Sequence, residues 1–259
     1  MRYLKRVDYH VHTNFSDGQA SYAEVIDRAK EIGLYSIAIT DHFDSFDKGK
    51  SFCLKTDDEL MDHFDRIREY GSKIGQNVLC GIETCTDYEG NLRLSDIVIE
   101  SCDIIITSPH YVEYDGPLIP GHYFNDCYWE AYKRKVLNMA RGPGDILGHS
   151  EGYLPLGKLL VPGTTTYEER KKLCYKIACR YFDNEYIDEL AKMLKISGKA
   201  LELHCATHTP REAVIQKMIE NKISISLGSD SHVLPSVGKV EWGLSVLEKY
   251  NGEKLQFIK

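Results

Sequence analysis

The stretch VDYHVHTNFSDG, residues 7–18, joins a short apolar run to two histidines and an aspartate. Side chains two residues apart on a strand point to the same face, so His10 and His12 can reach one metal ion. Short apolar runs recur at residues 36–40, 78–82, 104–107, 145–147, 200–203 and 223–227. Each is about as long as a strand, and several are rich in β-branched residues, as buried parallel strands are. We therefore expect seven strands, the first at residues 7–12.

The segments between these runs carry signals for helices. A serine or threonine followed three residues later by glutamate is a capping box, and this pattern begins at Ser21, Thr56, Thr166 and Thr209. The last of these has Pro210 at the first helical position. Strands that alternate with helices favour a parallel β/α organisation, most simply a barrel. A doubly wound open sheet has the same local pattern, and periodicity cannot separate the two.

Composition indicates a soluble α/β protein, and we expect a single domain over residues 1–259. No apolar run approaches the roughly 18 residues of a membrane-spanning helix, and the start lacks the apolar core of a secretory signal, so a cytoplasmic protein is expected. The formal charge of −7 argues against nonspecific binding to nucleic acid. The eight cysteines, among them Cys80, Cys102 and Cys179, are expected to be buried free thiols.

Every apolar run ends in a potential metal ligand. In chain order these are His10, His12 and Asp17, then His42, Glu83, His110, His149, His204, Asp230 and His232. In parallel α/β folds the carboxyl ends of the strands meet at one edge, where active sites are built. Imidazole and carboxylate ligands suit Zn, Mn or Fe, and the lack of cysteine argues against a closed structural zinc site. A cluster with more than four members suggests two or more metals, which polarise phosphoryl oxygens and generate hydroxide near neutral pH.

Several polar residues near these ends leave two interpretations open. His122, His204 and His208 are either ordinary structural histidines or substrate contacts. Asp8 and Asp41 each precede a ligand candidate, and they are either hydrogen-bond partners that orient an imidazole or acids of a turn.

The same residues carry a family resemblance. The motifs are His10-x-His12 with Phe15-Ser16-Asp17-Gly18, Thr40-Asp41-His42, Gly81-Ile82-Glu83, Ser108-Pro109-His110, Gly148-His149 and Ser229-Asp230-Ser231-His232. In this order they resemble the motifs of the PHP (polymerase and histidinol phosphatase) superfamily, over residues 8 to 238. Chain length makes the sequence similar to the stand-alone histidinol-phosphatase-like branch. The resemblance implies a distorted (β/α)7 barrel, TIM-like, with a trinuclear metal site at the carboxyl ends of the strands.

The resemblance also implies a set of ligands for two to three divalent ions. The first ion would take His10, His12, Glu83 and Asp230; Glu83 would bridge to a second, held by His110 and His149; Asp17, His42 and His232 would hold the third. Glu83 and Asp230 would thus be catalytic. His204 is a candidate for protonating the leaving group.

Two departures from that branch concern the substrate. A basic residue often follows its Gly-His motif and grips the phosphate, whereas here residues 150–158 read SEGYLPLGK. Its sixth strand commonly ends with a small amide, and this one ends with His204. Because helix N-termini favour anions, Arg211 is the expected phosphate anchor unless it is merely a solvated helix residue, and Lys158 comes second. Substrate contacts are also expected at His208 and His122.

These expectations describe a metal-dependent phosphomonoesterase. By resemblance, the leading substrate is L-histidinol phosphate, an intermediate of histidine biosynthesis, followed by nucleotides and other phosphorylated metabolites. The alternative is a non-catalytic, metal-stabilised binding module, as degenerate PHP domains attached to polymerases are. Oligomeric state is not predicted.

Overall fold

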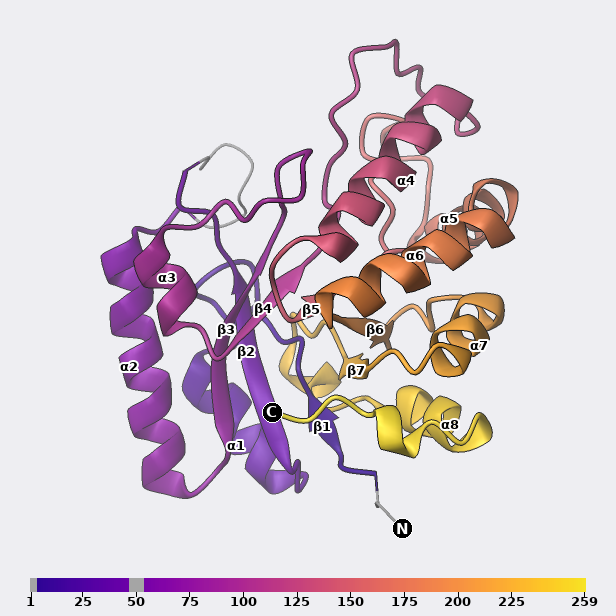
Figure 1. The fold of residues 1–259 in the computed structure, drawn as a ribbon. Coiled ribbons are helices and arrows are strands. Elements are labelled where there is room, and N and C mark those ends of the chain that lie inside the picture. Colours follow the sequence, from indigo (N-terminus) through magenta and orange to yellow (C-terminus); the bar gives the residue numbers. More distant parts are fainter. Residues whose placement is uncertain (1–3, 47–53) are drawn as a thin grey trace.

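The computed structural model describes residues 4–46 and 54–259. Seven parallel strands form one sheet in chain order (Figure 1). They are β1 (Val7–Asp8), β2 (Ser36–His42), β3 (Val78–Thr84), β4 (Ile104–Thr107), β5 (Ile146–Leu147), β6 (Ala200–His204) and β7 (Ile225–Gly228). Each lies within two or three residues of its predicted bounds, except that β1 stops at Asp8 although the chain continues beside its neighbours.

The sheet closes into a barrel where the chain continues past β1. The Tyr9 amide donates to the Leu227 carbonyl at 2.9 Å, and the His12 amide donates to the Ser231 carbonyl at 2.9 Å. The first and last strands are therefore joined by main-chain hydrogen bonds, which an open sheet would lack. The prediction of a distorted seven-stranded α/β barrel is confirmed, and the doubly wound alternative is excluded.

Helices surround the strands. They are α1 (Tyr22–Glu31), α2 (Asp57–Ile74), α3 (Asp96–Ser101), α4 (Asp126–Arg141), α5 (Tyr167–Tyr181), α6 (Asn184–Ser197), α7 (Glu212–Glu220) and α8 (Glu241–Lys249), with short 3₁₀ turns at Leu234–Ser236 and Glu253–Leu255. The capping boxes at Ser21, Thr56 and Thr166 are present. The predicted box at Thr209 is wrong. The main chain of Thr209 instead pairs with that of His204, so α7 begins later, with Arg211 as its N-cap.

The core lies between the sheet and these helices in two clusters of apolar side chains. One includes Trp129 of α4 and Leu190 of α6, and the other includes Ile26 of α1 and Phe64 of α2. All seven residues of β2 are buried, because a parallel sheet inside a barrel is covered on both faces. In Figure 1, α1 to α3 flank the first strands, and α4 to α8 lie on the opposite side of the molecule.

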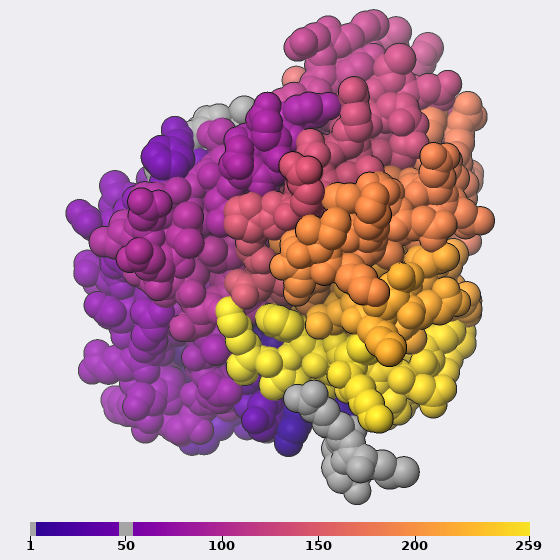
Figure 2. Space-filling model, in the orientation of Figure 1, coloured from indigo at the N-terminus to yellow at the C-terminus, as the bar shows by residue number. Residues whose placement is uncertain are grey.

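Two long segments rise above the carboxyl ends of the strands. Residues 108–125 follow β4 and residues 148–166 follow β5, and neither range contains a helix or strand. They contact each other where the Gly121 amide donates to the Leu159 carbonyl at 2.8 Å, and the Tyr128 hydroxyl of α4 donates to the Pro155 carbonyl at 2.6 Å. Figure 2 shows the chain after β4 projecting at the upper right of the surface. These segments form one wall above the strand ends.

Two other expectations can be compared with the described residues. Among these residues no cysteine forms a disulfide, as expected, and Cys80 is buried. Cys127 and Cys179 are exposed and Cys102 is half-buried, so the expectation of burial is wrong for Cys127 and Cys179. None of the helices in the described ranges has the length and apolar character needed to cross a membrane.

Candidate metal centre and active site

All nine predicted metal ligands come together at the carboxyl ends of the strands. Overlapping groups of three or four, each compact enough to share an ion, are His12, Asp17, His42 and His232; His10, His12 and Glu83; His10, His149 and Asp230; and His42, Glu83 and His110. The alternating strands and helices bring them there, because each residue lies at the end of a strand or in the loop that follows a strand. Residues more than 200 positions apart in the sequence, such as His12 and His232, thereby come into contact.

Glu83 occupies the centre of the cluster. Its Oε1 lies 2.8 Å from His149 Nε2 and 3.1 Å from His110 Nε2. Its Oε2 lies 3.0 Å from His42 Nδ1 and 3.3 Å from His10 Nε2. The two carboxylate oxygens thus face different sets of imidazoles, which is the arrangement that a bridging carboxylate requires.

The charge of Glu83 is stabilised by these imidazoles. Burial raises the pKa of the carboxyl group, but His10, His110 and His42 together hold that pKa well below its usual range. Conversely, burial lowers the pKa of His10, while the carboxylates of Glu202 and Glu83 raise it well above the ordinary value. The site therefore carries buried negative charge that attracts cations.

Unpaired nitrogen atoms show that this cluster fits metal ions. In the part of the chain that the structure describes, His10 Nε2, both ring nitrogens of His12 and His149 Nδ1 are buried without a hydrogen-bond partner. His12 Nε2 lies 3.2 Å from Asp230 Oδ1, and His10 Nε2 lies 3.3 Å from Glu83 Oε2. Ligand atoms about 2.0–2.1 Å from one tetrahedral ion are separated by about 3.3 Å. Because a buried polar atom without a partner is destabilising, these nitrogens are better explained as ligands.

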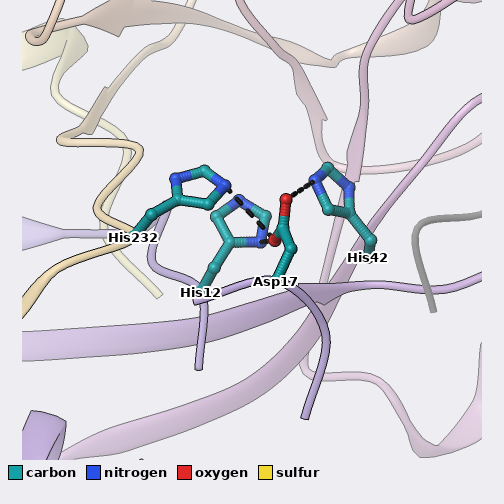
Figure 3. A group of neighbouring side chains, drawn as sticks. All are labelled: His12, Asp17, His42 and His232. Atoms are coloured by element: carbon teal, nitrogen blue, oxygen red, sulfur yellow. Dashed lines mark ion pairs between the residues drawn. The ribbon is translucent and has the colours of Figure 1, made fainter. Parts of the chain in front are cut away.

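Asp17 organises a second part of the cluster. Its Oδ1 lies 3.3 Å from His232 Nε2 and 3.8 Å from His12 Nδ1, and its Oδ2 lies 3.6 Å from His42 Nε2. Figure 3 shows the three imidazole rings arranged around this carboxylate. Burial opposes the charge of His232, but the hydrogen bond to Asp17 and the charge of Asp230 raise the pKa of His232 to about 9. This group contains the three residues expected for a third ion, Asp17, His42 and His232, together with His12, which was expected to hold the first.

Glu202 of β6 is a functional residue that sequence reasoning missed. Its Oε1 accepts a hydrogen bond from His10 Nδ1 at 2.6 Å, and its Oε2 accepts one from the His149 main-chain amide at 2.7 Å. It therefore orients one ligand and fixes the backbone of another. The sequence feature that could have identified Glu202 is its position as a charged residue in the middle of an otherwise apolar strand.

Asp8 and Asp41 organise loops rather than imidazole ligands. Asp41 accepts hydrogen bonds from Thr13, Ser16 and His63, and Asp8 accepts them from Ser229 and Gly238. Burial would raise the pKa of Asp41, but the hydrogen bond and charge of His63 lower it to about 2. Both aspartates thus hold the turns that present Asp17 and Asp230.

His204 was expected to contact the leaving group, but its side chain lies elsewhere. Its Nε2 donates to Asp230 Oδ2 at 2.9 Å, and its Nδ1 is hydrogen-bonded to Thr207 Oγ1 at 2.6 Å. The side chain is fully buried and does not line the cavity above the cluster. Because both ring nitrogens have partners, His204 acts on Asp230 and not on a substrate.

Arg211 also differs from its expected role as the phosphate anchor. Its Nε and Nη2 donate to Glu151 at 2.9 to 3.2 Å, and Nη2 also donates to the Phe182 carbonyl at 2.7 Å. Only 3% of the Glu151 side chain is exposed, and a buried carboxylate requires a cationic partner. The guanidinium group is therefore engaged inside the protein.

The other expected substrate contacts lie outside the cavity as well. Lys158 and His122 are exposed residues of the two long segments, and neither lines the cavity. The His208 ring stacks on Trp242 with centroids 5.0 Å apart, beside two other hollows. The geometry supports none of these three as a contact for a phosphate at the cluster.

A cavity of about 440 Å³ opens above the cluster. Besides predicted ligands, its lining contains Tyr153, Pro155, Gly157 and Arg170. Within the described residues, Arg170 Nε is buried and has no hydrogen-bond partner, and Nη2 has one long hydrogen bond, 3.4 Å to the Leu154 carbonyl. Sequence reasoning missed Arg170, because it lies inside α5 and away from any strand end.

Comparison with known proteins is consistent with this site. Residues 8–206 match the family described as PHP domain. The chain therefore belongs to the PHP domain family, and the family predicted from the motifs is confirmed.

The relatives of this chain include proteins that it matches over most of their length and a longer protein that it matches over part of its length. It is 27% identical over 248 residues to a protein of Thermoanaerobacter sp. (strain X514) named "probable phosphatase", covering 93% of this chain and 85% of that protein. It is 23% identical over 252 residues to the DNA polymerase/3'-5' exonuclease PolX of Bacillus subtilis (strain 168), covering 93% of this chain but 37% of PolX. The expectation of a phosphatase-type enzyme agrees with the first of these names.

The fold is similar to that of a solved histidinol phosphate phosphatase from Lactococcus lactis subsp. lactis Il1403, which was crystallised with Zn, L-histidinol and phosphate. The TM-score is 0.64 at 20% sequence identity, and the match covers 96% of this chain and 94% of the other. This likeness supports the barrel assignment.

Proposed function

We propose that this protein is a metal-dependent phosphomonoesterase. The observation that carries the proposal is the bridging position of Glu83 between two sets of imidazoles, directly beneath a cavity that contains an arginine with a buried, unpaired Nε. In the reaction, water attacks phosphorus, the P–O bond to the alcohol breaks, and the alcohol oxygen takes a proton. The products are an alcohol and inorganic phosphate.

Two to three divalent ions, Zn, Mn or Fe, would be held by the nine clustered ligands. When bound, such ions polarise phosphoryl oxygens and make water acidic enough to supply hydroxide near neutral pH. The protein's own part is to hold the ligands: Glu202 keeps the Nε2 atom of His10 directed at Glu83, and His204 keeps Oδ1 of Asp230 directed at His12.

Arg170 is the protein group best suited to bind the phosphate. Its guanidinium lies at the cavity and has no carboxylate partner among the described residues, whereas Arg211 is engaged by Glu151. Charge-assisted hydrogen bonds from a guanidinium match the geometry of phosphate oxygens. The Tyr153 ring lies 5.9 Å from Arg170 Cζ and supports the arginine from the loop after β5.

L-Histidinol phosphate is the substrate we propose first, which would place the enzyme in histidine biosynthesis in the cytoplasm. The fold likeness to the Lactococcus enzyme over 96% of this chain supports this choice. Nucleoside monophosphates and other small phosphate esters follow.

The test is phosphate release by purified protein loaded in parallel with Zn²⁺, Mn²⁺ or Fe²⁺. The panel contains L-histidinol phosphate, nucleoside monophosphates and sugar phosphates, and the Glu83→Gln variant is the matched control. We expect hydrolysis by the wild type, at least tenfold faster on L-histidinol phosphate in kcat/KM, and near-complete loss in the variant. A metal-loaded wild type that releases no phosphate from any ester would instead indicate a binding module.

A further inference from the structure

Lys135 of α4 is a fully buried cation close to the candidate metal centre. Its side chain is 0% exposed. Nζ donates to Glu113 Oε2 at 2.9 Å, to Glu113 Oε1 at 3.1 Å and to the Thr86 carbonyl at 3.1 Å. The same atom lies 3.9 Å from the centroid of the Tyr111 ring. A buried charge is tolerated only with such partners, so the ammonium holds these groups in fixed positions.

The partners of Lys135 belong to two segments that carry predicted ligands. Thr86 lies three residues after Glu83, and Glu113 lies three residues after His110. The Tyr111 hydroxyl also donates to the Thr86 carbonyl, at 3.3 Å. One side chain from a helix therefore ties the segment after β3 to the segment after β4, next to the point where His110 Nε2 and Glu83 Oε1 are 3.1 Å apart.

His110 is one of the predicted ligands that lie in a loop beyond the end of a strand. It lies at the start of residues 108–125, a range that the structure describes fully and that contains no helix or strand. The ladder between β3 and β4 ends at Thr107, and the Ser108 amide adds one further bond to the Thr84 carbonyl. Beyond that point the sheet no longer determines the path of the chain.

We propose that Lys135 is a positioning residue that sets His110 against Glu83 for the ion these two ligands would share. The proposal rests on the proposed metal centre, not on the identity of the substrate. Lys135 touches neither ligand. It acts through Glu113 and Thr86, which fix the two segments relative to each other. Replacing it should therefore weaken one metal site selectively and leave the Asp17 group intact.

The chain offers a matched control. Lys199 is also a buried lysine, 1% exposed, and its Nζ donates to Thr107 Oγ1, the Met139 carbonyl and the Pro143 carbonyl at 2.8 to 2.9 Å. Thr107 is the last residue of β4, Met139 lies in α4 and Pro143 precedes β5, so none of these three partners belongs to the two loops that Lys135 joins. Lys199→Met therefore reproduces the loss of a buried ammonium without removing the tie between those two loops.

The experiment titrates metal-free protein with Zn²⁺ and with Mn²⁺. Calorimetry and competition with a chelator measure the affinity of each binding event. Lys135→Met and Glu113→Gln should each weaken one binding event at least tenfold, and the double variant should lose no more than either single variant. Lys199→Met should retain wild-type metal affinities even if it unfolds at a lower temperature. Circular dichroism identifies folded variants, and Glu113→Gln supplies the test if Lys135→Met does not fold.

Two results would overturn the proposal. The first is a metal affinity within twofold of wild type in folded Lys135→Met and Glu113→Gln. The second is an equal loss of metal affinity in Lys199→Met, which would indicate general destabilisation. These experiments measure metal binding without any substrate hydrolysis. A wild type that binds the ions but hydrolyses nothing would therefore overturn the proposed function alone.

Discussion

The His10 imidazole donates from Nδ1 to Glu202 Oε1 at 2.6 Å, which leaves its Nε2 facing Glu83 Oε2 at 3.3 Å. One hydrogen bond on the far side of the ring thus decides which nitrogen is free to act as a ligand. Glu202 also accepts from the His149 amide, so a single carboxylate orients ligands that come from two different strands.

Glu202→Gln should therefore weaken metal binding although it removes no predicted ligand. The neutral amide makes a weaker bond to the imidazole, and loss of such an orienting partner typically costs about 10–100-fold in metal affinity. The measurement is chelator competition, with Glu212→Gln on the surface of α7 as the control. Equal affinities in Glu202→Gln and wild type would show that His10 is oriented without Glu202.

Arg170→Ala should raise KM for the best phosphate ester by about 10–100-fold, corresponding to about 1.4–2.7 kcal/mol. The guanidinium binds phosphate in both the ground and transition states, so kcat should change less. Metal content should remain at the wild-type level because no ligand is altered. A KM within about twofold of wild type would remove Arg170 from the substrate site.

Arg211→Ala should affect stability rather than substrate binding. Truncation leaves the Glu151 carboxylate buried and unpaired, which should lower the free energy of unfolding by about 3–5 kcal/mol. Urea unfolding measures this loss, and the folded fraction should keep a wild-type KM. A large rise in KM at unchanged stability would restore Arg211 as the phosphate anchor.

Lys199 should make stability depend on pH above neutrality. Burial lowers the pKa of Lys199 to about 7, whereas a lysine in the unfolded chain titrates at about 10.4. Between these values the unfolded state binds more protons, so this residue's contribution to stability rises with pH, by at most about 1.4 kcal/mol per pH unit. The free energy of unfolding of wild type minus that of Lys199→Met should therefore increase from pH 7 to pH 9. A constant difference would show that the buried amine stays protonated.

The clustering of the nine candidate ligands could be predicted from sequence because their positions follow from topology. Each apolar run ends in His, Asp or Glu, and a parallel barrel brings all such ends to one edge. The phosphate contact could not be predicted in the same way. Arg211 pairs with Glu151, 60 residues away, through the folding of two loops that no local pattern describes.

The proposed roles of Arg170 and Lys135 could not be predicted from sequence for a related reason. Both lie within helices, where their spacing resembles that of ordinary surface cations, and only the packing of α5 and α4 on the barrel directs them inward. The start of α7 was also misplaced, because the main chain of Thr209 pairs with that of His204. Tertiary packing thus decided where Arg170 and Lys135 point, and a pairing within the loop after β6 decided where α7 begins.

The central claim is that the nine clustered ligands form a centre for more than one metal ion. Elemental analysis of protein purified gently and reconstituted with Zn²⁺ or Mn²⁺ tests it most directly. We predict two to three ions per chain in the wild type and fewer in Glu83→Gln, because a bridging carboxylate serves two ions. One ion per chain or fewer in the reconstituted wild type would contradict the account.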